Sequence, residues 1–500
     1  MSTRSPNQRG LEQLPRELWL EILSWLTCER DAVLEVNERD GMDFQRRIPK
    51  AMTVLKATKA DLRNLCLTCR FLNFNTQPAL YEFFDQVVKE PRSLPLFLRT
   101  LLRQPKLALH VRRVDAHFLV SDRARFYGRR LPREDGPLFT SALNRHRFMG
   151  DKTRKQFQDL FRVGSTMGDT LAVLLLWHTP NLRELNIEHE DGPGYAMLEE
   201  LILKTLLYPV SSLPFSKLQK LKIWFSSPHE FSRASPWLLL PSLQSLDVRG
   251  TYASTCNPAL QDLKNLRWRV DSIRSLNNLA TFTSSVTSLV IHCDKMILDA
   301  LYDILFYCKA LKSFELYWSP FHPKNPTDFN LHETLKALLC RKDSLSKLRL
   351  DIGPRLEGAG RYFVRGTESK LQEREKNVPS AVSFKAFEQL THLHVPGPAL
   401  HEWLTVYRDD VLPPTLEILK LPTFEISTRD EIDDLVNELV LKGLGQCPLL
   451  KMITFGLNGE DMRGIRGTLS IRFNEGGFSV EARNASGDLV EVDDLALVVD

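Results

Sequence analysis

A repeated apolar pattern runs along most of this 500-residue chain. Its unit is Leu-x-x-Leu-x-Leu, in which other apolar residues replace some of the leucines. The end of the unit alternates apolar and polar residues, which predicts a short strand with one buried face. Nine clear copies begin at Leu182, Leu218, Leu243, Val286, Leu311, Leu345, Leu390, Leu416 and Leu450, and a poorer copy begins at Leu263.

The segments between the copies differ in length, and two of them, 298–305 and 432–444, have the spacing of apolar residues that is typical of a helix. A short strand coupled repeatedly to a longer, often helical segment resembles a leucine-rich-repeat solenoid. One such unit cannot bury its apolar face alone, but stacked neighbours bury a continuous core. We expect the Gly-rich, charged segment 353–383 to be a surface loop.

Helical patterns precede the repeats. Residues 14–26 carry apolar side chains at four-residue steps, and Pro15 stands where a first-turn proline belongs. Trp19, Leu23 and Trp25 widen the apolar surface, so this helix must be covered on more than one side.

A second helix is predicted to begin at Asp61 as its N-cap. Its helically spaced apolar residues are Leu62, Leu65, Cys66, Cys69 and Leu72. Pro78 is predicted to start another short helix. The charged stretch 28–60 between the two patterns is interpreted as a loop or a short extra helix, because Gly41 and Pro49 break it.

Residues 85–170 are predicted to form a basic helical connector. Within 99–163 there are 16 Lys or Arg residues against 6 Asp or Glu residues. Helices are expected at 93–103 and 154–161, with a loop at 128–137. The segment could bind nucleic acid, phospholipid or an acidic target, but a solvated linker is favoured because the sequence has no recognisable nucleic-acid module.

The end of the chain changes pattern again. Residues 469–473 and 478–481 both alternate, and the Glu-Gly-Gly stretch at 475–477 lies between them, which predicts a β-hairpin. An acidic tail follows. The predicted organisation is therefore 11–84, 85–170, a repeat domain over 171–458, and a hairpin with its tail over 459–500.

The first of these segments resembles an F-box. The resemblance lies in three blocks in the correct order: Leu-Pro-Arg-Glu-Leu at 14–18 with Ile22, Leu23 and Leu26 behind it, the stretch 61–70, and Gln-Pro-Ala-Leu-Tyr-Glu at 77–82, an ending common in fungal members. It covers roughly residues 11–84, with an insertion at about 28–60. The repeats are similar to those of F-box proteins with leucine-rich repeats, although they lack the regular Asn. Cys308 and Cys447 stand three residues before their triplets, as in cysteine-containing repeats.

The resemblance implies an α/β fold: a helical F-box followed by an irregular leucine-rich-repeat solenoid of short parallel strands and helices. It also implies a non-catalytic substrate receptor of an SCF-type ubiquitin ligase, which docks a Skp-type adaptor and thereby a cullin-RING ligase. The expected adaptor contacts are Leu14, Pro15, Leu18, Ile22, Leu23, Leu62 and Leu65. The alternative is a scaffold outside any ligase that binds proteins through its repeats alone.

An unknown protein target is expected to bind beside the strand leucines. The candidate residues are Arg183, Glu184, Lys222, Arg249, His292, Glu315, Arg349 and His394. His392 and His394 should share one strand face, and a surface pair is favoured over a metal site. Cys66 and Cys69 are interpreted as buried thiols.

Composition adds little that changes this interpretation. The net charge of +4 neither demands nor excludes an anionic partner. Scattered cysteines and a polar N-terminus favour the cytoplasm or nucleus, and no membrane span is expected. We expect no catalytic residues, no metal and no cofactor, because no phosphate loop, nucleophile elbow or metal-ligand spacing is found.

Overall fold

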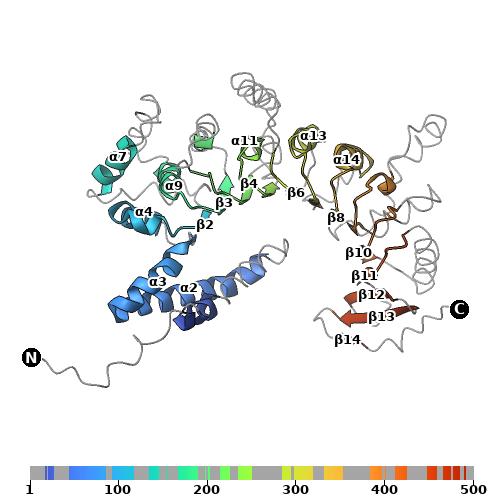
Figure 1. Ribbon diagram of the computed structural model, residues 1–500, viewed down its shortest axis with the longest axis horizontal. Coiled ribbons are helices and arrows are strands. Elements are labelled where there is room, and N and C mark those ends of the chain that lie inside the picture. Colours follow the sequence, from blue (N-terminus) through green and yellow to red (C-terminus); the bar gives the residue numbers. More distant parts are fainter. Residues whose placement is uncertain are drawn as a thin grey trace, which may run out of the picture. The chain divides into compact units, whose positions relative to one another are not determined.

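The computed structural model (Figure 1) divides into two compact units, Met1–Lys220 and Leu221–Asp500. Each unit is described by itself. The structure describes the following residues: 17–19, 21–27, 44–85, 93–116, 135–145, 155, 167–189, 198, 201–202, 214–225, 235–250, 284–293, 298–318, 331–352, 383–396, 400, 412–424, 447–458, 466–474, 477–484 and 489–490.

The first unit begins with a small group of helices. Residues 17–19 and 21–27 are helical, as predicted, and they are followed by α2 (Phe44–Thr68) and α3 (Arg70–Glu82). Trp19 and Leu23 point into the core of this group, and the Trp19 ring meets the Phe71 ring edge-on with centroids 6.0 Å apart. An aromatic pair of this kind adds to the stabilisation from buried area.

Two predicted helix starts in this group are wrong. Asp61 lies inside α2, which is one continuous helix of 25 residues, and half of the stretch 28–60 therefore belongs to this helix. Asp61 is exposed there, so its carboxylate stays in water. The good helix formers around it therefore let the helix continue through this position. The next N-cap is Cys69, whose sulfur accepts a hydrogen bond from the Leu72 N–H at 3.5 Å, and Pro78 lies inside α3.

The remainder of the first unit alternates strands and helices. Three strands, β1 (Phe83–Asp85), β2 (Arg113–Ala116) and β3 (Glu184–His189), pair in parallel. The helices are α4 (Ser93–Arg103), α5 (Pro105–Ala108), α7 (Asp135–Arg145) and α9 (Met167–His178). The predicted helix at 93–103 is thus confirmed. The helix predicted at 154–161 lies outside the described residues, except for residue 155.

Strand β2 lies in the segment that was predicted to be a helical connector. Its residue Val114 and the preceding Val111 have the spacing of the repeat, and both are fully buried. The repeat pattern therefore begins one unit earlier than the sequence analysis placed it. Helix α7 also starts at Asp135, inside the predicted loop at 128–137, of which residues 128–134 lie outside the described part.

The second unit contains the other strands, in chain order along the sheet. They are β4 (Lys220–Phe225, whose first residue belongs to the first unit), β5 (Ser245–Gly250), β6 (Ser288–Cys293), β7 (Ser313–Trp318), β8 (Lys347–Ile352), β9 (His392–His394), β10 (Ile418–Phe424), β11 (Met452–Asn458), β12 (Arg466–Asn474), β13 (Gly477–Asn484) and β14 (Leu489–Val490). Every pairing from β5 to β11 is parallel.

Helices of the second unit lie on one side of its parallel strands (Figure 1). They are α11 (Ser235–Leu238), α13 (Leu298–Tyr307) and α14 (Leu331–Leu338), with 3-10 turns η6 (Leu339–Arg341) and η8 (Phe384–Ala386). The helical prediction at 298–305 is confirmed. The prediction at 432–444, the poor copy at 263 and nearly all of the expected loop 353–383 lie outside the described residues.

The predicted hairpin is confirmed. Strands β12 and β13 pair antiparallel, with Phe473 opposite Phe478, and β12 also pairs antiparallel with β11. The parallel series therefore ends in an antiparallel meander that covers the last parallel strand edge. The edge of the sheet therefore passes from β11 to β13 and the short β14, and a very short edge strand limits pairing with other chains. The expected acidic tail lies outside the described residues.

The repeated leucines explain this architecture. All three apolar residues of the nine clear copies are at most 5% exposed. In eight of the nine clear copies, the N–H one residue after the first apolar position donates to the carbonyl of the equivalent residue in a neighbouring unit; examples are Lys312 to Thr287, Ser346 to Lys312 and Thr391 to Ser346, at 2.8–2.9 Å. A backbone ladder of this kind holds the copies in register.

Hydroxyl side chains reinforce that ladder. Ser285 and Thr415, each just before a copy, donate to the carbonyls of Leu243 and Leu390 at 2.7 and 3.0 Å. The fold is thus mixed α/β with a mostly parallel sheet and helices. In the described parts of the chain, none of the helices is both long and apolar enough to cross a bilayer.

Candidate interaction surfaces

The N-terminal helix presents an apolar stripe on its outer side. Leu18, Ile22 and Trp25 are 44%, 38% and 72% exposed, whereas Trp19 and Leu23 on the other side are 4% and 6% exposed. Positions 18, 22 and 25 recur at the i, i+4, i+7 spacing of one helix face. Three large apolar side chains that share one exposed face are typical of a docking surface.

The predicted adaptor contacts fall into different environments. Leu18 and Ile22 are exposed, but Leu23 and Leu62 are buried and Leu65 is half-buried. The structure thus places Leu23 and Leu62 in the core of the helical group, because they face α2, α3 and the N-terminal helix. Leu14 and Pro15 lie outside the described residues. Trp25 was not among the predicted adaptor contacts, although the i, i+4, i+7 spacing of Leu18, Ile22 and Trp25 indicates that it shares their face.

Polar side chains occupy the strand face opposite the buried leucines of the second unit. We name this set the polar strip, and its members are Lys222, Trp224, Asp247, Arg249, His292, Glu315, Tyr317, Lys347, Arg349, Asp351, His392, His394 and Lys420. Parallel pairing in register aligns them across strands, for example Glu315 with Arg349 and Arg349 with His394. Five of the predicted target-binding residues of this unit lie here in β5–β9, and Lys222 lies in β4.

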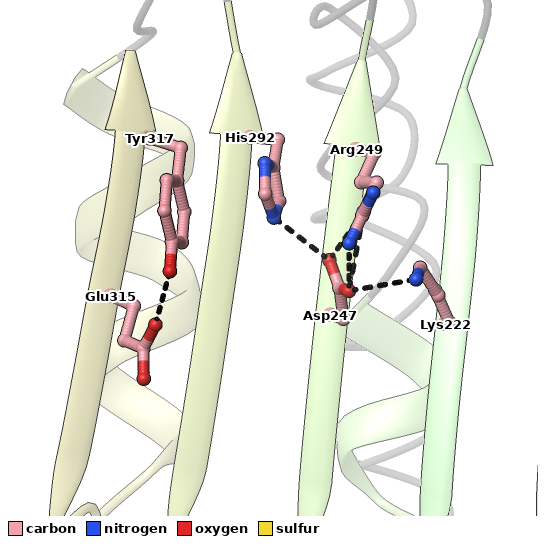
Figure 2. Close-up of polar contacts among 6 residues, drawn as sticks. All are labelled: Lys222, Asp247, Arg249, His292, Glu315 and Tyr317. Atoms are coloured by element: carbon pink, nitrogen blue, oxygen red, sulfur yellow. Dashed lines mark hydrogen bonds and ion pairs between the residues drawn. The ribbon is translucent and has the colours of Figure 1, made fainter. Parts of the chain in front are cut away.

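Asp247 is the centre of an ion cluster at one end of the polar strip (Figure 2). Arg249 donates to both carboxylate oxygens at 3.0–3.2 Å, Lys222 approaches to 3.7 Å, and the His292 Nε2 atom lies 3.7 Å away. The Arg249 guanidinium also covers the Trp224 ring at 4.8 Å. Arg249 is buried and holds this cluster together through these contacts, and its assignment to target binding stays a prediction.

Stacked rings continue the strip. The His292 and Tyr317 rings are nearly parallel with centroids 4.3 Å apart, and the Arg349 guanidinium lies 4.7 Å from the centre of the Tyr317 ring. The Tyr317 hydroxyl donates to Glu315 at 2.7 Å (Figure 2), and Arg349 donates to Asp351 at 2.9 Å. These contacts fix the side chains in place, which lowers the entropic cost of binding a partner.

Burial and neighbouring charges shift the pKa values of this strip. Burial alone would raise the pKa of Asp247, but the charges of Arg249 and Lys222 outweigh it and lower the pKa. Burial, assisted by the same two cations and opposed by Asp247, lowers the pKa of His292 to about 3. Burial, with Arg349 and Lys420, also lowers the pKa of His394 to about 3. Both imidazoles are therefore neutral near pH 7.

Those histidines should make the second unit sensitive to mild acid. Their pKa values lie below the ordinary 6.5, so the unfolded chain binds more protons between pH 6.5 and 3, and stability falls as the pH drops through that range. At pH 5 each histidine should lower the free energy of unfolding by about 2 kcal/mol. Hydrogen exchange of β6–β9 amides at pH 7 and 5 measures it. A His292→Gln/His394→Gln variant should lose less protection, and an equal loss in both proteins would contradict the assignment.

The two other target-binding candidates belong to the first unit. Arg183 is exposed and lies just beside Leu182, one residue before β3 begins. Glu184 begins β3 and is held between Arg113 and Lys220, each at 3.1 Å. Glu184 is therefore half-buried and paired within its own unit, and it offers little free charge to a target.

The thiols and histidines behave as side chains of the fold. Cys66 and Cys69 are only half-buried, because they lie at the junction of α2 and α3, so the prediction of buried thiols is wrong for this pair. Cys308 and Cys447 are buried, and burial raises the pKa of the Cys308 thiol to about 12.

His392 and His394 flank the buried Leu393 on one strand face, as predicted. Among the described residues, no group of three metal-binding side chains occurs.

No family model matches the chain, and no curated protein matches it.

Proposed function

We propose that this chain is a non-catalytic substrate receptor of an SCF-type ubiquitin ligase. In this proposal residues 11–84 are an F-box, and the strand-and-helix units behind it are an irregular leucine-rich-repeat solenoid. The N-terminal helix docks a Skp-type adaptor and thereby a cullin-RING ligase, while the polar strip holds a protein target. Ligase subunits then supply catalysis by bringing the target's lysines close to a charged ubiquitin carrier.

The exposed apolar stripe of Leu18, Ile22 and Trp25 is the observation that carries the proposal. The helix packs into the core of its own unit through Trp19 and Leu23. The outward stripe is therefore not needed for that core. Protein interfaces are built around such a cluster of large apolar and aromatic anchors within a polar rim. Exposed Glu17 and Glu21 beside the stripe supply polar neighbours. The matching order of the three F-box-like blocks then favours a Skp-type adaptor as the partner.

A scaffold outside any ligase is the second candidate. The long spacer after Leu26 favours it, because residues 28–60 exceed the spacer of a typical F-box, and the described part of that spacer, 44–60, belongs to helix α2. The extra turns could obstruct the adaptor surface while leaving the repeats free to bind a protein.

Purified full-length protein should co-purify with a Skp-type adaptor in a 1:1 complex on size-exclusion chromatography. A variant with residues 29–57 replaced by a short linker serves as the comparison, because it keeps the buried Thr58 and Leu62. Equal binding by both proteins supports the receptor. Binding by the shortened variant alone supports the scaffold, and binding by neither removes the F-box assignment.

A further inference from the structure

We propose that the β8–β10 part of the polar strip is a carboxylate-binding site that takes an acidic, extended segment of the protein target. The site comprises Lys347 and Arg349 on β8, His394 on β9 and Lys420 on β10. This inference deepens the target-binding part of the proposed function and rests on it. Its test needs no adaptor, so failure of this site and failure of ligase docking can be told apart.

Two buried nitrogen atoms at the centre of the site have no hydrogen-bond partner. They are the Nε atom of Arg349 and the Nε2 atom of His394, and these two residues are paired in the β8–β9 register. A buried polar atom without a partner carries a free-energy cost. An incoming carboxylate would remove that cost by accepting from both nitrogens.

The Arg349 guanidinium is held ready for such a ligand. It lies on the Tyr317 ring, and one terminal nitrogen donates to Asp351, which leaves the Nε edge without a partner. A neutral His394 can place a hydrogen on Nε2 and donate it. Planar guanidinium groups fixed in this way are well suited to bidentate recognition of carboxylates.

Charge differs between the two ends of the polar strip. Around Asp247 the cations are paired within the protein. The polar-strip residues on β8–β10 include three cations, Lys347, Arg349 and Lys420, and one carboxylate, Asp351. Lys347 and Lys420 are exposed. This end therefore carries an excess of positive charge that complements an anionic partner.

The spread of the cations favours a segment with several carboxylates over a single phosphate. Residues two apart on a strand are about 7 Å apart, and β8 and β10 are separated by about 10 Å, twice the strand spacing. A phosphate group is too small to meet all three cations. An extended acidic segment repeats its side chains on one face at the same interval of about 7 Å, so successive carboxylates can reach successive cations.

Fluorescence anisotropy of the full-length protein with rhodamine-labelled peptides tests this site. The probes are a twelve-residue peptide of alternating Gly and Glu, its Gln counterpart, and the Gln counterpart with one phosphoserine. The Glu peptide should bind the wild type at least tenfold more tightly than the Gln peptide. An Arg349→Gln/Lys420→Gln variant should lose about tenfold in affinity for the Glu peptide.

Two matched variants complete the experiment. Lys347→Gln/Lys420→Gln changes only exposed side chains, so its expected tenfold loss cannot come from misfolding. Lys309→Gln/Lys336→Gln removes the same charge from other exposed positions of this unit and should bind as the wild type. Equal binding of Glu and Gln peptides, binding of the phosphoserine peptide alone, an equal loss in the control variant, or tighter Glu-peptide binding once the chain's own tail 491–500 is removed would each overturn the proposal.

Discussion

Replacement of Asp247 by alanine should destabilise the second unit by about 3–5 kcal/mol, because it leaves a buried cation without its counter-ion. Arg249 is 4% exposed, and it donates three hydrogen bonds to the Asp247 carboxylate. Lys222 would lose the same partner. The effect is large relative to the total stability of about 5–15 kcal/mol that is typical of a domain, so partial unfolding of β4–β6 is expected.

Hydrogen exchange of the β5 and β6 amides measures this loss. Glu315→Ala is the matched control, since it also removes a carboxylate from the polar strip but leaves only a half-buried Tyr317 hydroxyl without its acceptor. For that control we expect the free energy of unfolding to fall by at most about 1–1.5 kcal/mol, which is the contribution of one hydrogen bond. Asp247→Leu/Arg249→Met should recover most of the stability. Full protection in Asp247→Ala would show that Arg249 finds another partner.

The strands of this fold could be predicted because their signal is local. In the nine clear copies each apolar residue faces the core, so one alternating pattern determines both the strand and its buried face. The register between neighbouring strands follows from the same pattern, because a shift by one residue would exchange the buried and the exposed face.

Phe314 shows what the pattern specifies. It takes the second leucine position of its copy and stands opposite Leu289 and Leu348 on the neighbouring strands. All three side chains are buried. The pattern therefore tolerates an aromatic residue at a leucine position, because the requirement is a large apolar side chain on the core face of the strand.

Other features could not be predicted because they depend on contacts far apart in the sequence. The ion cluster joins Lys222, Asp247 and His292 from three strands, and only their alignment in the sheet brings them together. The continuity of α2 could not be predicted for another reason. Asp61 is a good N-cap residue, but in the middle of a helix it is tolerated when its side chain reaches water. Local propensity could not decide between these two roles.

The N-terminal helix shows the same limit. Leu18, Ile22 and Leu23 were predicted together as adaptor contacts, but periodicity cannot tell which of two apolar sides is covered by the chain's own helices. Packing against α2 and α3 decides it, and Trp19 and Leu23 become core while Leu18 and Ile22 stay outside. Among the described residues of this helix, the proposed adaptor contacts are thereby narrowed to the outer stripe, which makes the test of the proposal more specific.

A Leu18→Asp/Ile22→Asp variant should lose adaptor binding by at least a hundredfold. Each substitution would bury a carboxylate in an apolar interface at a cost of several kcal/mol, while both side chains face solvent in the free protein, so folding should be little affected. Titration of the Skp-type adaptor by calorimetry measures the loss, and circular dichroism checks the fold. Glu17→Gln/Glu21→Gln, on exposed positions of the same helix, is the control and should bind within a few-fold of the wild type.

The contrast with the inner side of the helix separates docking from folding. Leu23→Asp should lower the melting temperature as well as binding, because Leu23 lies in the core. The outer variant should lower binding alone, since its side chains make the surface and not the core. If the outer variant bound the adaptor as the wild type does, the stripe would not be the docking surface, even if the chain still entered a ligase. If both variants lost their fold, adaptor binding by Leu18→Ser, which adds no charge, would test the stripe in their place.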